Sequence, residues 1–180
     1  EPELPLSGHI RADIGPDGLP RMLDGRILID KGAIIDLDDP LVGRIPIDRA
    51  EFNLDWDAVR RALMVPFQIV SGGTRMTLLA QFDAPRDPGG IWDVKITGGT
   101  VMLAAAAPGD VALALNRILV QLSVDPGRQR IAVEKGEVGN NDLGFALKGS
   151  LDLSSDDPRV VLGVAGTRMS VAALKRLWPV

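Results

Sequence analysis

The chain contains no cysteine and no tyrosine, and His9 is its only histidine. Without cysteine it can form no disulfide, thiolate metal site or cysteine nucleophile, and a single histidine cannot supply a pair of imidazole ligands. Long apolar runs are also missing. The longest, residues 101–107, ends at Pro108, whereas a helix that crosses a bilayer needs about 20 apolar residues. These absences exclude thiol chemistry and most metal centres, and they predict no membrane-spanning helix in this sequence.

Basic residues are slightly outnumbered by acidic ones. Lys and Arg total 20 against 24 Asp and Glu, which gives a net charge of −4. A chain with no excess of positive charge is poorly suited to neutralising phosphates, so nucleic-acid binding is disfavoured. The 180 residues, 46% of them hydrophobic, are enough for one domain with a sizeable core. The 20 glycines and 13 prolines indicate many short elements joined by turns.

The strongest pattern is alternation of apolar and polar residues with period two, which is typical of strands with one buried face. Between Arg75 and Phe82 only Leu79 departs from it. Four further segments alternate in the same way, and together the five predict an all-β fold whose sheet has one apolar face. The apolar positions of these segments are Phe52, Leu54, Trp56, Met76, Leu78, Ala80, Phe82, Trp92, Val94, Ile96, Ile118, Val120, Leu122, Phe145 and Leu147.

Glycine, asparagine and aspartate mark reversals between these segments, because they accept the backbone conformations that tight turns require. The intervals between reversals are mostly too short for crossover helices, so the sequence predicts an antiparallel meander. The predicted reversals are at residues 17–18, 24–25, 72–73, 88–90, 98–99, 126–127 and 140–142.

Three segments carry helical signals. Asp57–Met64 could form a turn of helix that Pro66 would stop. Residues 110–122 have near-helical spacing at first but alternate later, and we expect a strand from about Arg117. Ser170–Leu177 is the one helix that we predict, with the serine as its N-cap.

Candidate catalytic groups are few. His9 lies among residues that suit an exposed strand, and Ser71 has no other histidine with which to form a triad. The acidic pairs at residues 38–39 and 156–157 each precede a proline, which is ordinary turn chemistry, although paired carboxylates can also serve acid–base catalysis across a cleft. No phosphate-binding, dinucleotide-binding or zinc-protease motif is present. We therefore expect no catalytic residue, no metal and no cofactor.

Two stretches resemble the AsmA-like family of Gram-negative envelope proteins, in the branch related to YhdP and TamB that was long catalogued as a domain of unknown function. The first runs from FNLDWD at residues 52–57 through Pro66-Phe67 and Ser71-Gly72-Gly73 to Trp92, and the second is GVAGTRMSVAALKRLWP at residues 163–179. The resemblance covers most of the chain, and its motifs are structural markers without catalytic content.

The resemblance implies a curved antiparallel groove of repeated β-hairpins with a hydrophobic inside. It also implies that residues 1–180 are a single β domain within a longer periplasmic protein anchored to the inner membrane. Phospholipid acyl chains, neighbouring segments of the same chain, and inner- and outer-membrane proteins would be its partners. The fifteen apolar residues named above would then line a lipid groove, in a protein that transports phospholipid or maintains the outer membrane.

Alternation alone leaves the covering of the apolar face open. A strand with one apolar face must bury that face against another layer or against lipid. The first hypothesis is therefore an open, lipid-bearing groove, and the alternative is a closed β-sandwich that serves as a structural or interaction domain of an envelope scaffold. A hydrolase that depends on His9 is a third, less favoured reading.

Overall fold

The computed structural model describes residues 5–36, 44–87, 89–105, 111–155 and 159–169. These residues form one open antiparallel sheet and no helix, which confirms the all-β prediction. The strands are β1 (Leu6–Ile14), β2 (Pro20–Asp36), β3 (Arg44–Asp57), β4 (Ala62–Ser71), β5 (Thr74–Asp83), β6 (Trp92–Leu103), β7 (Leu113–Leu115), β8 (Arg117–Asp125), β9 (Arg130–Gly139), β10 (Leu143–Asp152) and β11 (Arg159–Met169).

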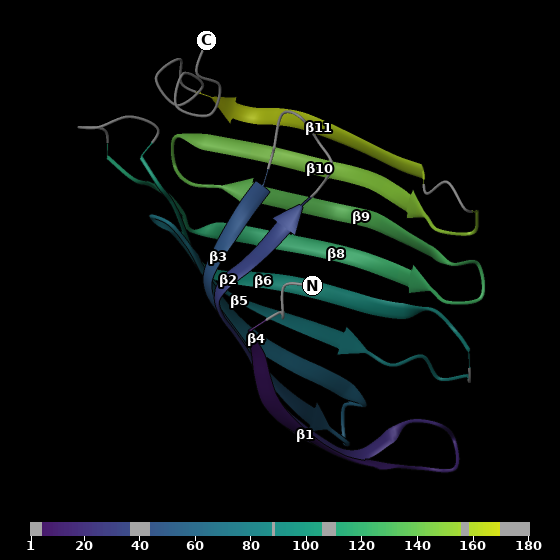
Figure 1. The fold of residues 1–180 in the computed structure, drawn as a ribbon. Coiled ribbons are helices and arrows are strands. Elements are labelled where there is room, and N and C mark those ends of the chain that lie inside the picture. Colours follow the sequence, from purple (N-terminus) through teal and green to yellow (C-terminus); the bar gives the residue numbers. More distant parts are fainter. Residues whose placement is uncertain (1–4, 37–43, 88, 106–110, 156–158, 170–180) are drawn as a thin grey trace.

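The strands are hydrogen-bonded almost entirely in chain order (Figure 1). The order is β1-β2-β3-β4-β5-β6-β8-β9-β10-β11, and the short β7 pairs with the end of β6. β1 and β11 are the two edges. Because every connection is a hairpin or a short loop, the predicted antiparallel meander is confirmed and no crossover is present among the described residues.

Several local predictions need correction, and one is confirmed. Residues 24–25 and 98–99 do not reverse the chain: Gly25 pairs inside β2, and Gly98 lies at a register shift inside β6. Residues 58–61 form a turn, but residues 62–64 already belong to β4. The adjacent strands β3 and β5 supply the backbone hydrogen bonds that a helix would otherwise make. The strand expected from Arg117 is present as β8. The helix predicted at Ser170–Leu177 lies outside the described residues.

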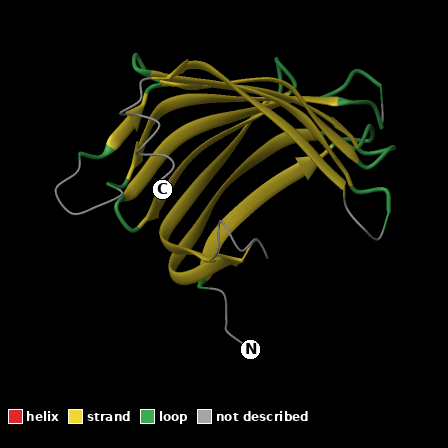
Figure 2. Ribbon diagram, turned by 90° about the horizontal axis from the view of Figure 1, so that it is seen from above, coloured by secondary structure: helices red, strands yellow, loops and turns green. Residues whose placement is uncertain are grey.

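The sheet is strongly curved. In Figure 1 the far ends of the long strands β2 and β3 pass in front of the middle of the sheet, and Figure 2, turned by 90°, shows the strands wrapping round as an arch. The lining of one surface hollow also indicates that the sheet curls at the end where the turn before β2 lies. Asp17, in the turn before β2, and Trp92, at the start of β6, line the same surface hollow. In a flat sheet β2 and β6 would be about 19 Å apart, four strand spacings.

The turns after β3 and β8 are built alike. Asp57 ends β3, and its Oδ1 accepts the backbone N–H of Arg60 at 2.9 Å. Asp125 ends β8, and its Oδ1 accepts the backbone N–H of Arg128 at 3.0 Å. In both turns the arginine also lies 3.7 Å from the aspartate Oδ2. The two hairpins therefore share one turn design.

The residue after each of these arginines completes the similarity. Arg61 and Gln129 are the two non-glycine residues with positive φ, at 54° and 50°, among the described residues. The carbonyl of Arg61 accepts the N–H of Ala84 at 2.9 Å, and that of Gln129 accepts the N–H of Leu153 at 2.8 Å. β4 and β9, which follow these turns, each have 10 residues. The strands β3 to β5 thus correspond to β8 to β10.

Asn140 lies in the turn between β9 and β10, at the other end of β9 from the turn that follows β8. Its Nδ2 donates to the carbonyl of Ala114 in β7 at 2.7 Å, and its Oδ1 accepts the N–H groups of Asp142 and Leu143 at 2.9 and 2.8 Å. The guanidinium of Arg117 donates to the Asn140 carbonyl at 2.8 Å. One side chain therefore ties β7 to the turn between β9 and β10.

No helix among the described residues is long and apolar enough to cross a membrane.

Candidate functional site

One face of the sheet is apolar from edge to edge. Residues that are Cα partners in adjacent strands share a face, so the register defines rows of side chains that cross the sheet. The row nearest its middle contains only apolar residues and glycine. From β1 to β6 its members are Gly8, Ile27, Phe52, Phe67, Leu78 and Gly98. From β8 to β11 they are Ile118, Val138, Phe145 and Gly166.

A parallel row lies nearer the turns that follow β3 and β8. It runs through eight strands without a polar residue. Its members are Trp56, Leu63, Phe82, Val94, Leu122, Val133, Gly149 and Leu162.

All fifteen residues that the sequence singled out lie on this face. The rows above contain eight of them, and Ala80, Ile96, Val120 and Leu147 belong to a further row between those two. Leu54 pairs with Gly25, Met76 with Val101 and Trp92 with Val124, on the same face. None of the fifteen is fully exposed.

The burial of these residues indicates that the apolar face is the concave one. Trp56, Ala80 and Val94 are 8%, 6% and 4% exposed, although the described residues provide no second layer. A side chain on a flat single sheet would keep one side open to water, whereas on a concave surface it is covered by side chains of neighbouring strands. Eight of the nine buried hydrophobic residues belong to this face, and no buried polar side chain is present in the described part of the chain.

Two apolar clusters occupy different parts of the concave face. Ile47 and Ala50 in β3 pack with Ile29, Phe52 and Ile69 from the neighbouring strands. The second cluster draws on β5 to β10, and its buried members are Val101, Leu115 and Leu143. Gly98 lies within the second cluster, where a Cβ would come 2.8 Å from the Cβ of Ile118, so its lack of a side chain lets Ile118 lie close to the backbone.

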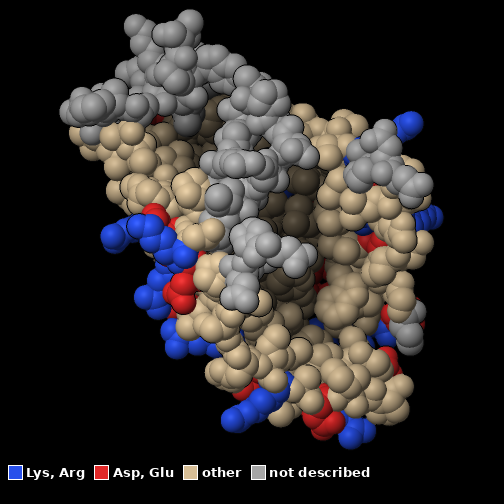
Figure 3. Space-filling model, in the orientation of Figure 1, with Lys and Arg blue, Asp and Glu red and all other residues tan. Residues whose placement is uncertain are grey.

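The opposite face is polar and carries ion pairs. Arg26 and Arg49 lie 2.9 and 3.5 Å from the carboxylate of Glu51, and Asn53 donates to it at 3.3 Å. The hydrogen bond from Arg26, followed by that from Asn53, holds the pKa of Glu51 below its ordinary value. The charged side chains in Figure 3 gather along the outer margins, and the visible part of the hollowed middle is lined mostly by uncharged residues.

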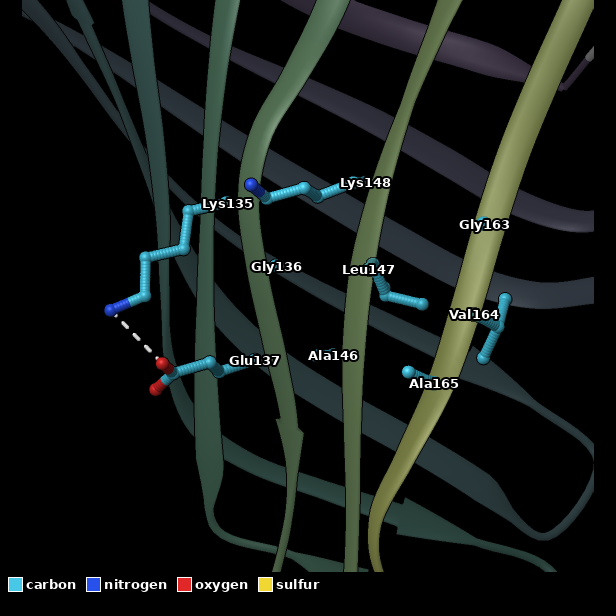
Figure 4. A pocket seen from close by; sticks show the side chains of 9 residues that line it. All are labelled: Lys135, Gly136, Glu137, Ala146, Leu147, Lys148, Gly163, Val164 and Ala165. Atoms are coloured by element: carbon cyan, nitrogen blue, oxygen red, sulfur yellow. Dashed lines mark ion pairs between the residues drawn. The ribbon is translucent and has the colours of Figure 1, made fainter.

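A shallow hollow of about 450 Å³ lies over β9, β10 and β11 (Figure 4). Lys135, Glu137 and Lys148 project to one side of the strands there, and Leu147 and Val164 project to the other. Lys135 Nζ and Glu137 Oε1 are 2.9 Å apart. On β10 the polar Lys148 and the apolar Leu147 project to opposite faces, whereas the edge strand β11 contributes only Gly163, Val164 and Ala165 to this hollow.

The candidate catalytic residues are not brought together. His9 is exposed on β1, three strands away from β4, where Ser71 lies. The Ser71 hydroxyl donates to the carbonyl of Pro46 at 2.6 Å. The acidic pairs at residues 38–39 and 156–157 lie outside the described residues. Within the described ranges, no group of three or more His, Cys, Asp or Glu side chains is arranged to hold a metal ion.

Some residues of the apolar face had no clear signal in the sequence. Leu63 and Phe67 in β4 point into it, but Met64 and Pro66 on the polar face of the same strand are not polar, so alternation was hidden. Arg61 was missed as well. The turn at Arg61 is equivalent to the turn at Gln129. A comparison of the two would have marked position 61, which has a positive φ, as unusual for a long charged side chain.

No family model matches this chain, and searches of curated proteins and of solved structures found no match either. The fold and the site together define its class, which is an open, single-layered antiparallel sheet with one apolar, concave face.

Proposed function

We propose that this chain is a non-catalytic, lipid-binding segment of a cell-envelope protein that transports phospholipid or maintains the outer membrane. The observation that carries the proposal is the row from Gly8 to Gly166, which crosses ten strands without a polar side chain. In this proposal the concave face is a groove wall, and acyl chains take the place of a second layer, which the described residues do not provide.

The energetics favour such an occupant. Each methylene that leaves water for an apolar surface contributes about 0.8 kcal/mol, so an acyl chain lying along several strands would bind without any specific polar contact. A monomeric soluble protein seldom leaves a large contiguous apolar face uncovered. The periplasmic setting, the anchoring to the inner membrane and the membrane-protein partners rest on the resemblance at residues 52–92 and 163–179.

Strand β5 offers the sharpest test because it presents both faces in one short segment. A photocrosslinking amino acid is placed singly at Met76, Leu78, Ala80 and Phe82 on the apolar face. The matched controls are Arg75, Thr77 and Gln81 on the polar face of the same strand. The chain is produced in the periplasm of a Gram-negative host, illuminated, and analysed by mass spectrometry for phospholipid adducts.

Adducts confined to the four apolar-face positions are the expected result. Equal adducts on both faces would indicate non-specific contact with membrane, and the absence of any lipid adduct on the apolar face would contradict the proposal.

The alternative function is an interaction domain that binds other envelope proteins. The observation that favours it is β11, an edge strand whose Val160, Val161, Leu162 and Val164 are all more than half exposed. In the crosslinking experiment this alternative predicts protein adducts only.

A further inference from the structure

Two adjoining hollows lie at the end of the sheet where the turns before β2, after β3 and after β5 meet. One has a volume of about 500 Å³ and is lined by residues that include Arg21, Trp56 and Arg61. The other, of about 490 Å³, is lined by residues that include Arg61, Arg86 and Trp92. Arg61, together with Asp17 and Leu19, lines both hollows, so the two adjoin at these side chains.

The site lies directly beside the apolar face. Trp56 and Trp92 belong to that face, because they pair with Leu63 and Val124. Trp56 is also the β3 member of the apolar row that runs across the sheet at this end. An elongated apolar molecule lying along that row would have its end at the arginines.

The three arginines have no carboxylate partner among the described residues. Arg61 donates to the carbonyl of Pro85 at 3.1 Å, which occupies one of its five N–H groups. By contrast, Arg60, its neighbour in sequence, is paired with Asp57. Unpaired arginines gathered at one place are unusual in a chain with a net charge of −4, and guanidinium groups suit phosphate oxygens, which they can bind in pairs.

Trp56 lines the hollow without offering it a hydrogen-bond donor. Its side chain is buried, and its indole N–H has no hydrogen-bond partner within the described part of the chain. The indole nitrogen itself is buried, so it does not face the hollow, and Trp56 contributes its ring to the wall of the site.

The site also contains acidic side chains. Asp17 accepts the backbone N–H of Leu19 at 3.2 Å, and Asp87 lies in the loop before β6. With three arginines against two aspartates, the site keeps an excess of positive charge.

We propose that these hollows bind the phosphate group of a phospholipid whose acyl chains lie on the apolar face. The inference rests on the proposed function and adds to it where the headgroup lies and in which direction the acyl chains extend. The headgroup is held at the end of the sheet that carries Arg21, Arg61 and Trp56, and the chains extend from there along the rows. Phosphate oxygens accept hydrogen bonds from the guanidinium groups of the arginines.

The test compares two ligands with identical acyl chains, dihexanoylphosphatidylglycerol and dihexanoylglycerol, by titration calorimetry on the purified chain. The test variant is the double substitution Arg21→Gln/Arg61→Gln. Glutamine suits position 61, because Gln129 occupies the equivalent turn position with nearly the same φ. The matched control is Arg60→Gln/Arg128→Gln, which removes the same charge from two arginines that do not line the hollows.

We expect the unsubstituted chain to bind the phospholipid about tenfold more tightly than the diacylglycerol, a difference of about 1.4 kcal/mol. The ratio of the affinity for the phospholipid to that for the diacylglycerol should fall to about one in Arg21→Gln/Arg61→Gln. It should persist in the control variant, which keeps the charge-assisted hydrogen bonds to phosphate.

The outcomes separate this inference from the function on which it rests. Equal affinity for the two ligands, or a ratio that survives in Arg21→Gln/Arg61→Gln, overturns the headgroup site and leaves acyl-chain binding intact. If neither ligand binds, both proposals fail. Inorganic phosphate alone is the third probe. If it binds through the same arginines while neither amphiphile binds, the hollows take free phosphate, and the lipid source is overturned.

Discussion

Phe52 and Phe67 stack across β3 and β4, with their ring centroids 5.6 Å apart and their planes inclined by 20°. They are Cα partners in the central row of the apolar face, where β4 lacks one backbone donor because of Pro66. The aromatic contact therefore joins the two strands at a point where their hydrogen-bond ladder is weakened.

Phe67→Ala should destabilise the chain by about 2 kcal/mol, less than for a fully buried ring because Phe67 is only half-buried. Urea unfolding followed by circular dichroism measures the change. Phe67→Leu, which keeps most of the apolar volume, should lose less than half as much. No loss of stability in Phe67→Leu would mean that ring stacking contributes nothing.

Gly136→Ala tests how closely the strands of the apolar face approach. A Cβ at Gly136 would lie 2.6 Å from the Cβ of Leu147, which cannot move without its backbone. We expect a loss of about 1–3 kcal/mol in unfolding free energy, as for other overpacked sites. Gly163→Ala is the control, because its Cβ would meet only the Lys148 carbonyl at 3.6 Å. If both variants unfold at the same urea concentration, the close approach at Gly136 is not real.

The Arg26–Glu51 pair should make stability depend on pH in the acid range. The pKa of Glu51 is lower in the folded chain than its ordinary 4.5, so its contribution is present above that value and is lost as the pH falls through the folded pKa. Below about pH 4.5, the urea midpoint should therefore fall more steeply for the unsubstituted chain than for Glu51→Gln. High salt should narrow the difference because the pair is partly exposed. Parallel curves for the two proteins would contradict this account.

Self-association through β11 is expected as concentration rises. An unpaired edge strand with apolar side chains on both faces is a template for another strand, and Val161 on its polar-face side is 66% exposed. Val161→Lys should keep the chain monomeric in sedimentation velocity at concentrations where the unsubstituted chain associates. Thr100→Lys, also on an exposed polar-face position but in the internal strand β6, should have no such effect.

The side-chain faces could be predicted from the sequence, whereas the shape of the sheet could not. Alternation placed Met76 and Phe82 on one face because the period of a strand is fixed by its backbone geometry. It could not place Asp17 and Trp92 in the wall of one hollow, since that arrangement depends on accumulated twist across four strand spacings. The arginines of the hollows carried no recognisable motif, because Arg21 lies at the start of β2, Arg61 in the turn after β3 and Arg86 in the loop before β6, far apart in the sequence.

The neighbour-to-neighbour order of the strands makes the molecule modular in length. Nearly all contacts between strands join partners that are adjacent in the sheet, so no element depends on a distant one for its position. Excising β9 and β10 as a pair would leave β8 and β11 still antiparallel, with Leu122 and Leu162 on the same side. A gene encoding such a sheet can gain or lose hairpins in evolution without a new packing solution, and the reach of the apolar surface would change in steps of two strands.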